Sequence, residues 1–135
     1  MWIIKKLVKS SRYAIEGLWH AYRVDKSFML EITLGLPIYA ALVYCLAPLE
    51  PSELILLIGS YLLVLIVELI NTAFEKMLDK LHPDEHVVIK RSKDIAAGAV
   101  LVAFIFASMV IGVLVYDKMT IVRHNSEFML GAVAV

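Results

Sequence analysis

One helical face in the middle of the chain carries side chains suited to phosphate chemistry. Glu68, Asn71 and Glu75 are spaced three and four residues apart, which places them together on one side of a helix. That side therefore holds two carboxylates and an amide. Because Mg²⁺ prefers one or two carboxylates together with phosphate oxygens, and a carboxylate can accept the proton of an attacking hydroxyl, this combination is typical of phosphoryl transfer.

Other charged residues are expected at the same level of the molecule. Arg91, Lys93 and Asp94 flank the start of the next apolar segment, and a lysine there can neutralise phosphate charge. Asp25 and Glu31 lie at the start of the preceding apolar segment and are expected at the same level. The chain contains neither a G-x-x-x-x-G-K-[ST] phosphate loop nor a G-x-G-x-x-G signature, so any nucleotide site must be of an unrelated type.

The polar groups on this face also have purely structural interpretations. Glu68 could pair with Lys93 or Arg91 only to stabilise a helix bundle. Asn71 could form a hydrogen bond between helices, as Asn does in membrane proteins. Spacing alone does not decide between the two, but the additional carboxylates and the place of Asn71 between two glutamates favour catalysis.

The composition predicts that these residues belong to a membrane protein. Of 135 residues, 61% are hydrophobic and the mean hydropathy is +0.80, whereas a soluble domain is roughly 45 to 50% apolar. A soluble chain this short could not bury so much apolar surface. Basic and acidic residues balance at 13 each, so nothing indicates a nucleic-acid partner. We expect a single all-α membrane domain.

The order of apolar and charged segments predicts an amphipathic surface helix followed by three transmembrane helices. The first segment is interrupted by lysines but keeps apolar residues at helical spacing, which is typical of a helix in the membrane interface. The second span is long enough to cross the membrane only if it includes Glu68, Asn71 and Thr72. At membrane depth these polar groups must face the interior of the protein. The surface helix is expected at 2–23, and the three spans at about 28–46, 54–78 and 95–116. Together they form a membrane domain covering 1–116, and 117–135 is expected to be a C-terminal tail.

Two features refine the spans. Pro37 is expected to kink the first of them. Ala99, Ala103 and Ala107 recur at every fourth residue of the third, and such a stripe of small side chains lets a neighbouring helix approach closely. The spans are therefore expected to pack as a bundle.

Basic residues predict the orientation of the chain in the membrane. Six precede the first span, none lies in the first loop, five lie in the second loop and two follow the third span. Because cytoplasmic loops carry the excess of Lys and Arg, the N-terminus and the second loop are expected in the cytoplasm. The acidic residues described above then share the cytoplasmic level of the membrane.

The run from Glu68 to Ala99, ELINTAFEKMLDKLHPDEHVVIKRSKDIAAGA, combines E-x-x-N-x-x-x-E with a downstream K-D-x-x-x-x-A. It resembles the signature region of the prokaryotic diacylglycerol/undecaprenol kinase family. The likeness extends upstream through DKSFMLE to Tyr13 and Gly17, and downstream to Tyr116. The resemblance implies a homotrimer in the bacterial inner (plasma) membrane, with a composite active site at the cytoplasmic interface between subunits. It also implies transfer of the γ-phosphate of Mg-ATP to a lipid hydroxyl.

The resemblance assigns roles to individual positions of this chain. Two positions depart from the family pattern: Asp25 stands where Glu is usual, and Lys6 stands where Arg is common and so lacks the planar fork that binds phosphate. The implied roles are catalysis by Glu68 and Asn71, Mg²⁺ binding by Asp25 and Glu75, nucleotide binding by Lys6, Tyr13, Asp25, Glu75, Glu85, His86, Lys93 and Asp94, and lipid binding by Glu31, Glu68 and Ala97.

Two alternatives concern the substrate and the class of protein. At the position of Glu31, this chain resembles the diacylglycerol branch of the family. The resemblance favours diacylglycerol as the acceptor and phosphatidic acid as the product. Undecaprenol is the alternative acceptor. A non-catalytic, holin-like oligomeric pore would also be small and three-spanning. Its polar residues should line the depth of a helix, whereas here they gather at one end.

Overall fold

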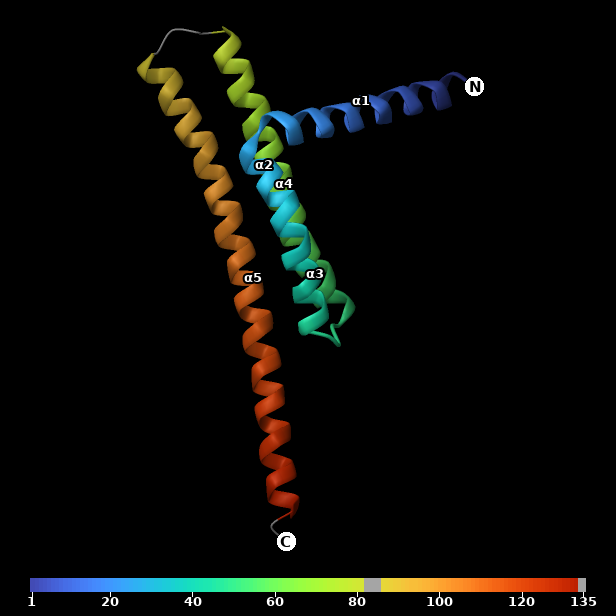
Figure 1. Cartoon of the computed structure of the whole chain (residues 1–135), viewed down its shortest axis with the longest axis vertical. Coiled ribbons are helices and arrows are strands. Elements are labelled where there is room, and N and C mark those ends of the chain that lie inside the picture. The colour runs from blue at the N-terminus through green and yellow to red at the C-terminus, as the bar shows by residue number, and fades with distance from the viewer. Residues whose placement is uncertain (82–85, 134–135) are drawn as a thin grey trace.

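The first helix of the chain stands apart from the others. The computed structural model describes the backbone of residues 1–81 and 86–133 and the side chains of residues 1–81 and 86–124. In it, helix α1 (Trp2–Val24) runs crosswise to the remaining helices and points away from them (Figure 1). Its large apolar side chains, among them Trp2, Leu7 and Trp19, are exposed. This arrangement suits a helix that lies along a membrane surface.

The first membrane helix consists of three consecutive segments. Helix α2 (Lys26–Leu30), the π-helical turn η1 (Glu31–Gly35) and helix α3 (Leu36–Cys45) follow one another without a break. Together they form a 20-residue candidate span, Lys26–Cys45. Pro37 interrupts the regular helix here, because proline cannot donate a hydrogen bond to the turn before it and its ring crowds the carbonyl four residues back. The irregularity expected at Pro37 is therefore found just before it.

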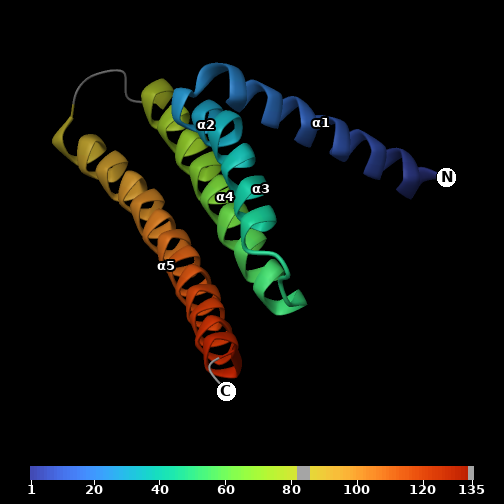
Figure 2. The same ribbon diagram turned by 60° about the horizontal axis from the view of Figure 1, so that its bottom comes forward.

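Two longer helices complete the fold. Helix α4 (Pro51–Leu81) and helix α5 (Val87–Val133) pack along each other, and α3 lies beside α4 (Figures 1 and 2). Both α4 and α5 contain apolar stretches long enough to cross a membrane. The described residues are all-helical, without a strand, so the prediction of a surface helix and three transmembrane helices is confirmed.

Small side chains allow α4 and α5 to approach each other. Ala103 and Ala107 of α5 are buried against Val64 of α4, whereas Ala99 is exposed. A second buried cluster lies nearer the other end of the bundle and consists of Leu46, Leu57, Val110 and Leu114. The alanine stripe therefore packs over two of its three positions.

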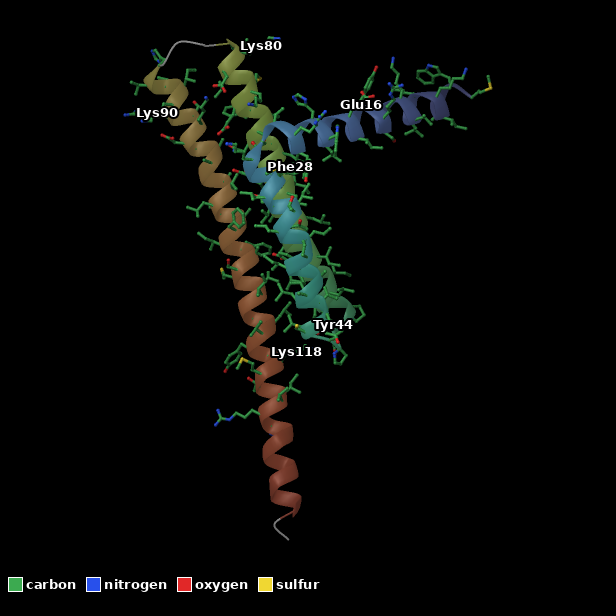
Figure 3. The ribbon with its side chains drawn as sticks, in the orientation of Figure 1. Glu16, Phe28, Tyr44, Lys80, Lys90 and Lys118 are labelled. Carbon is green, nitrogen blue, oxygen red and sulfur yellow. The ribbon has the colours of Figure 1, made fainter. Side chains whose placement is uncertain are left out.

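The helices differ in extent from the boundaries expected for the spans. Helix α4 continues to Leu81, and α5 continues as one helix through the segment assigned to a C-terminal tail, as far as Val133. At the end where α3 meets α4, Lys118 of α5 donates to the carbonyl oxygen of Pro48 at 3.0 Å and to the carboxylate of Glu53 at 2.9 Å. Figure 3 shows Lys118 and Tyr44 at this end and Lys80 and Lys90 at the opposite one.

Candidate active site

Three polar side chains of α4 are buried where its long apolar stretch ends. Glu68, Asn71 and Thr72 are 4%, 8% and 5% exposed, respectively. Glu75 is half-buried one turn farther along. Since α4 is helical throughout, Glu68, Asn71 and Glu75 lie along one of its sides. The helix thus buries a carboxylate and an amide within a segment long enough to cross a membrane, where such groups are costly.

Asp25 connects the beginning of the first membrane helix to α4. One oxygen of its carboxylate accepts a hydrogen bond from the backbone N–H of Phe28 at 3.0 Å and so caps α2. The other oxygen lies 2.8 Å from the hydroxyl of Thr72. That hydroxyl also lies 2.9 Å from the backbone carbonyl oxygen of Glu68. Thr72 therefore places Asp25 beside the helical turn that carries Glu68.

Four carboxylates form one interacting group at this level, which we call the carboxylate cluster: Asp25, Glu31, Glu68 and Glu75. Glu31 interacts electrostatically with Glu68 and Asp25, and Glu68 interacts in turn with Asp25 and Glu75. Like charges repel, so a bound cation or a bound proton would reduce the repulsion among these carboxylates. Three separate helical segments, α2 with its cap, η1 and α4, supply its members.

Two contacts on which the purely structural interpretations of Glu68 and Asn71 would rest are absent from the described part of this single chain. In the part of the chain that the structure describes, Glu68 forms no ion pair, and Lys93 is paired with Asp79 instead. The side-chain oxygen of Asn71 is buried and has no hydrogen-bond partner in the chain. A buried polar atom without a partner in the chain calls for an explanation, such as a bound water, a bound ion or a catalytic role. Asn71 therefore forms no hydrogen bond between helices through this oxygen.

An apolar cavity of about 350 Å³ adjoins Glu31. One carboxylate oxygen of Glu31 is buried and has no hydrogen-bond partner. A cavity with apolar walls and one available acceptor suits the end of a lipid that carries a hydroxyl. The residues lining the cavity are Leu30, Glu31, Leu34, Gly35, Ile38, Tyr39, Tyr61, Val64, Phe104, Ala107, Ser108 and Ile111.

Lys93 lies at the edge of the carboxylate cluster. It forms an ion pair with Asp79 across the ends of α5 and α4 and interacts electrostatically with Glu75. Its side chain is 32% exposed, so it is open to a ligand arriving from the aqueous side. Sequence reasoning missed Asp79, although it follows Glu75 by one helical turn.

The remaining residues assigned to the nucleotide and lipid are exposed. Tyr13 and Lys6 lie on α1, where Lys9 sits 5.7 Å from the Tyr13 ring and Lys6 sits 5.3 Å from the Trp2 ring. His86 immediately precedes α5, Asp94 and Ala97 lie on its first turns, and all three are exposed. A single chain does not bring these residues against the carboxylate cluster. Glu85 lies outside the described residues.

Sequence reasoning also missed Thr72 as a member of the site. Thr72 follows Glu68 by four residues, so it shares the same face of α4, and this spacing was a signal that could have found it. The side chain of Ser27, which also interacts with the Glu68 carboxylate, gives no comparable signal in the sequence.

The carboxylate cluster has the donor chemistry of a magnesium site. Within the described ranges 1–81 and 86–124, no group of three or more His, Cys, Asp or Glu side chains is arranged to hold a metal by itself. Mg²⁺ needs only one or two protein carboxylates when phosphate oxygens and water complete its shell. Asp25 and Glu75 flank Glu68 and offer such hard oxygen atoms. Each Asp25 oxygen accepts one hydrogen bond and keeps a second lone pair.

Comparison with known proteins covers most of the chain. The family model for prokaryotic diacylglycerol kinase matches residues 12–116. The diacylglycerol kinase of Escherichia coli (strain K12) is 33% identical over 103 residues, which are 76% of this chain and 82% of that protein. The diacylglycerol kinase of Haemophilus influenzae is 32% identical over 106 residues, 78% of this chain and 88% of that protein. The undecaprenol kinase of Bacillus subtilis is 31% identical over 118 residues, 84% of this chain and 89% of that protein.

The family-model match includes the whole carboxylate cluster and both long helices up to Tyr116. They agree with the resemblance of the E-x-x-N-x-x-x-E and K-D-x-x-x-x-A motifs, and they favour a kinase over a non-catalytic pore. The chain belongs to the prokaryotic diacylglycerol kinase family.

Proposed function

We propose that this protein is an ATP-dependent diacylglycerol kinase that transfers the γ-phosphate of Mg-ATP to the free hydroxyl of diacylglycerol and yields phosphatidic acid. Membership of a kinase family implies the use of ATP. The observation that carries the proposal is the buried Glu68, which lies along α4 between Glu75 and Val64, a residue that lines the cavity beside Glu31. This order along α4 supports a base that meets the lipid from the side of the cavity and the phosphate from the side of Glu75.

Glu68 acts as the general base. It lies seven residues deeper along α4 than Glu75, or roughly 10 Å at 1.5 Å per residue, so a lipid hydroxyl reaches it more easily than the nucleotide does. As the hydroxyl oxygen bonds to the γ-phosphorus, its proton passes to the Glu68 carboxylate and the bond between the γ-phosphorus and the ADP oxygen breaks. The unpartnered oxygen of Asn71, one turn along, orients the reacting groups.

Asp25 and Glu75 would hold the magnesium ion, which supplies charge neutralisation at the phosphates when bound. Asp25 is fixed by Thr72 and by its role as helix cap, so its carboxylate is held in place before any ligand arrives. Such preorganisation lowers the ordering that binding requires. Glu75 is half-buried and faces the same region from α4.

The nucleotide approaches from the end of the bundle where α4 ends and α5 begins. There, Lys93 leaves its ion pair with Asp79 and binds the phosphates instead. Asp94 and His86 contact the nucleotide from the same end of α5. Lys6, Tyr13 and Glu85 are assigned to the same ligand. Lys6 and Tyr13 lie on α1, whereas Lys93 and Asp94 lie on α5, so a second subunit would let residues of both helices meet at one nucleotide. We accordingly propose a homotrimer with sites shared between neighbours.

The lipid enters from the bilayer. Glu31 accepts a hydrogen bond from the lipid with its unpartnered oxygen, and the apolar cavity beside it holds the adjacent part of the glycerol backbone or acyl chain. Ala97 is assigned to the same ligand. Undecaprenol is the second candidate acceptor, because one relative with 31% identity is named an undecaprenol kinase. The site is proposed to face the cytoplasm of a bacterium from its inner (plasma) membrane.

A direct assay tests the proposal. The purified full chain is given radiolabelled ATP, Mg²⁺ and either diacylglycerol or undecaprenol in mixed micelles, and the lipid products are separated by thin-layer chromatography. We expect labelled phosphatidic acid at the higher rate. Faster labelling of undecaprenol would show that undecaprenol is the preferred acceptor and that the protein is still a lipid kinase. Labelling of neither lipid would contradict the proposed function.

A further inference from the structure

Tyr61 of α4 contacts the π-helical turn η1 at both ends. Its hydroxyl donates a hydrogen bond to the backbone carbonyl oxygen of Glu31 at 2.9 Å. Its ring lies against Gly35, where a Cβ atom would meet the Tyr61 Cε2 atom at 2.8 Å, closer than real Cβ atoms approach. Glu31 and Gly35 are the first and last residues of η1. The absence of a side chain at Gly35 is therefore what lets the ring of Tyr61 reach the turn.

The ring of Tyr61 has little freedom to move. Tyr61 is 8% exposed and stacks on Tyr39 of α3, with ring centroids 4.5 Å apart and planes inclined by 25°. Such aromatic pairs contribute beyond the area they bury. Tyr61 therefore forms a fixed support for η1 from the neighbouring helix.

The turn depends on a support of this kind. A π-helical turn is rare, and its wider backbone is less favourable than a regular helix. It also inserts one residue into the turn, which rotates the side chains on its two sides relative to each other by about 100°. The direction of the Glu31 side chain relative to α3 thus depends on whether η1 is maintained. Glu31 is the carboxylate that lines the apolar cavity and keeps one unpartnered oxygen.

We propose that Tyr61 is a positioning residue for the lipid acceptor: it holds η1 in its wide form and so keeps the Glu31 carboxylate directed into the apolar cavity. This inference rests on the proposed function, in which Glu31 binds the acceptor. Tyr61 acts through the backbone of Glu31 and through contact with Gly35, and it has no part in proton transfer.

The test is a kinetic comparison of Tyr61→Phe with the unchanged protein. The variant keeps the ring and its stacking but loses the hydrogen bond to Glu31. We expect the KM for the lipid acceptor to rise about two- to tenfold, as the loss of one hydrogen bond predicts. The KM for ATP should stay unchanged. Tyr44→Phe is the matched control, because Tyr44 is 84% exposed at the far end of α3 and should leave both constants unaltered.

Combining Tyr61→Phe with Glu31→Gln distinguishes a role of Tyr61 in positioning Glu31 from a general contribution of Tyr61 to stability. If Tyr61 acts through Glu31, Tyr61→Phe should add nothing to the rise in acceptor KM caused by Glu31→Gln. Equal effects in both backgrounds, or an unchanged acceptor KM in an active protein, would overturn the inference while the proposed function stands. Absence of lipid phosphorylation by the unchanged protein would overturn both, so the two failures are distinguishable.

Gly35→Ala provides an independent test if Tyr61→Phe fails to assemble. It keeps the hydroxyl of Tyr61 but displaces the ring from η1, so the acceptor KM should again rise with the KM for ATP unchanged. The matched control is Gly59→Ala on α4, since a Cβ atom at Gly59 meets nothing within 4 Å. Equal acceptor KM values for the two glycine variants would contradict the positioning role.

Discussion

The hydroxyl of Thr72 lies 2.8 Å from a carboxylate oxygen of Asp25 and joins the beginning of the first membrane helix to the middle of α4. The same aspartate caps α2 through its other oxygen, at 3.0 Å from the Phe28 backbone N–H. One side chain is therefore both a structural cap and the proposed metal ligand. Variants that keep the cap but remove the charge distinguish these two roles.

Asp25→Asn is such a variant. Asn is as good a helix cap as Asp, so the assembled protein should keep its thermal stability. Loss of the negative charge should weaken the proposed Mg²⁺ site, and the Mg²⁺ concentration for half-maximal activity should rise roughly tenfold or more. Titration of lipid kinase activity with MgCl₂ measures this rise.

Two further substitutions at the same position serve as controls. Asp25→Glu, which restores the residue usual in the family, should remain active if the carboxylate reaches the metal. Asp25→Ala should lose both activity and about 1 kcal/mol of stability, because it lacks a cap. Normal activity and normal Mg²⁺ dependence of Asp25→Ala would show that Asp25 is not a ligand, and Glu31 would become the candidate.

Lys93 and Asp79 allow the proposed nucleotide contact to be separated from the ion pair. Lys93→Met should raise the KM for ATP, because the phosphates lose a positive charge, with little change in the KM for lipid. Asp79→Asn breaks the same ion pair but leaves Lys93 free for the nucleotide, so it should not raise the KM for ATP. The pair is partly exposed and its loss should change stability little. Equal rises in both variants would mean that the ion pair, and not the lysine itself, matters.

The orientation in the membrane is tested with reporters. The distribution of basic residues predicts that a reporter at the C-terminus lies outside the cytoplasm and that one inserted near Asp84 lies within it. Alkaline phosphatase and green fluorescent protein fusions report the two sides by complementary activities. A cytoplasmic C-terminus would contradict the predicted orientation and would separate the carboxylate cluster from its proposed supply of ATP.

The periodic part of the site was readable from the sequence, whereas contacts between distant segments were not. The spacing of Glu68 and Asn71 is a property of one helix, so it predicted their common face directly. Asp25 and Thr72 are 47 positions apart, and no local pattern indicates that their side chains meet. Their contact depends on how α2 packs on α4, which tertiary packing decides.

The π-helical turn shows a second limit of sequence reasoning. Pro37 predicted a kink in the first span, whereas the structure has a π-helical turn just before it. The form depends on Tyr61 and Gly35, which lie on different helices and fit together only in the packed structure. The pairing of Lys93 with Asp79 was likewise hidden, because several acidic residues near the ends of α4 and α5 were equally plausible partners.

Replacement of Glu68 tests the central step of the proposed reaction. Glu68→Gln keeps the size and much of the hydrogen-bonding capacity of the side chain but cannot accept the proton of the lipid hydroxyl. We expect kcat to fall by roughly 10²- to 10⁴-fold, the usual contribution of a general base. The affinity for ATP should be largely retained, because the nucleotide is assigned to Lys93 and the outer carboxylates. Steady-state kinetics combined with nucleotide titration measures both quantities.

The competing explanation is that Glu68 only stabilises the bundle. Removal of its charge from a group of four carboxylates would then change stability or assembly, while the protein that assembles would turn over almost normally. For this reason kcat must be expressed per correctly assembled protein, with the assembled fraction measured by size-exclusion chromatography in detergent. Glu16→Gln on α1 is a suitable control, since that carboxylate is exposed and pairs only with Arg12 among the described residues. Near-normal turnover of assembled Glu68→Gln would refute the catalytic role.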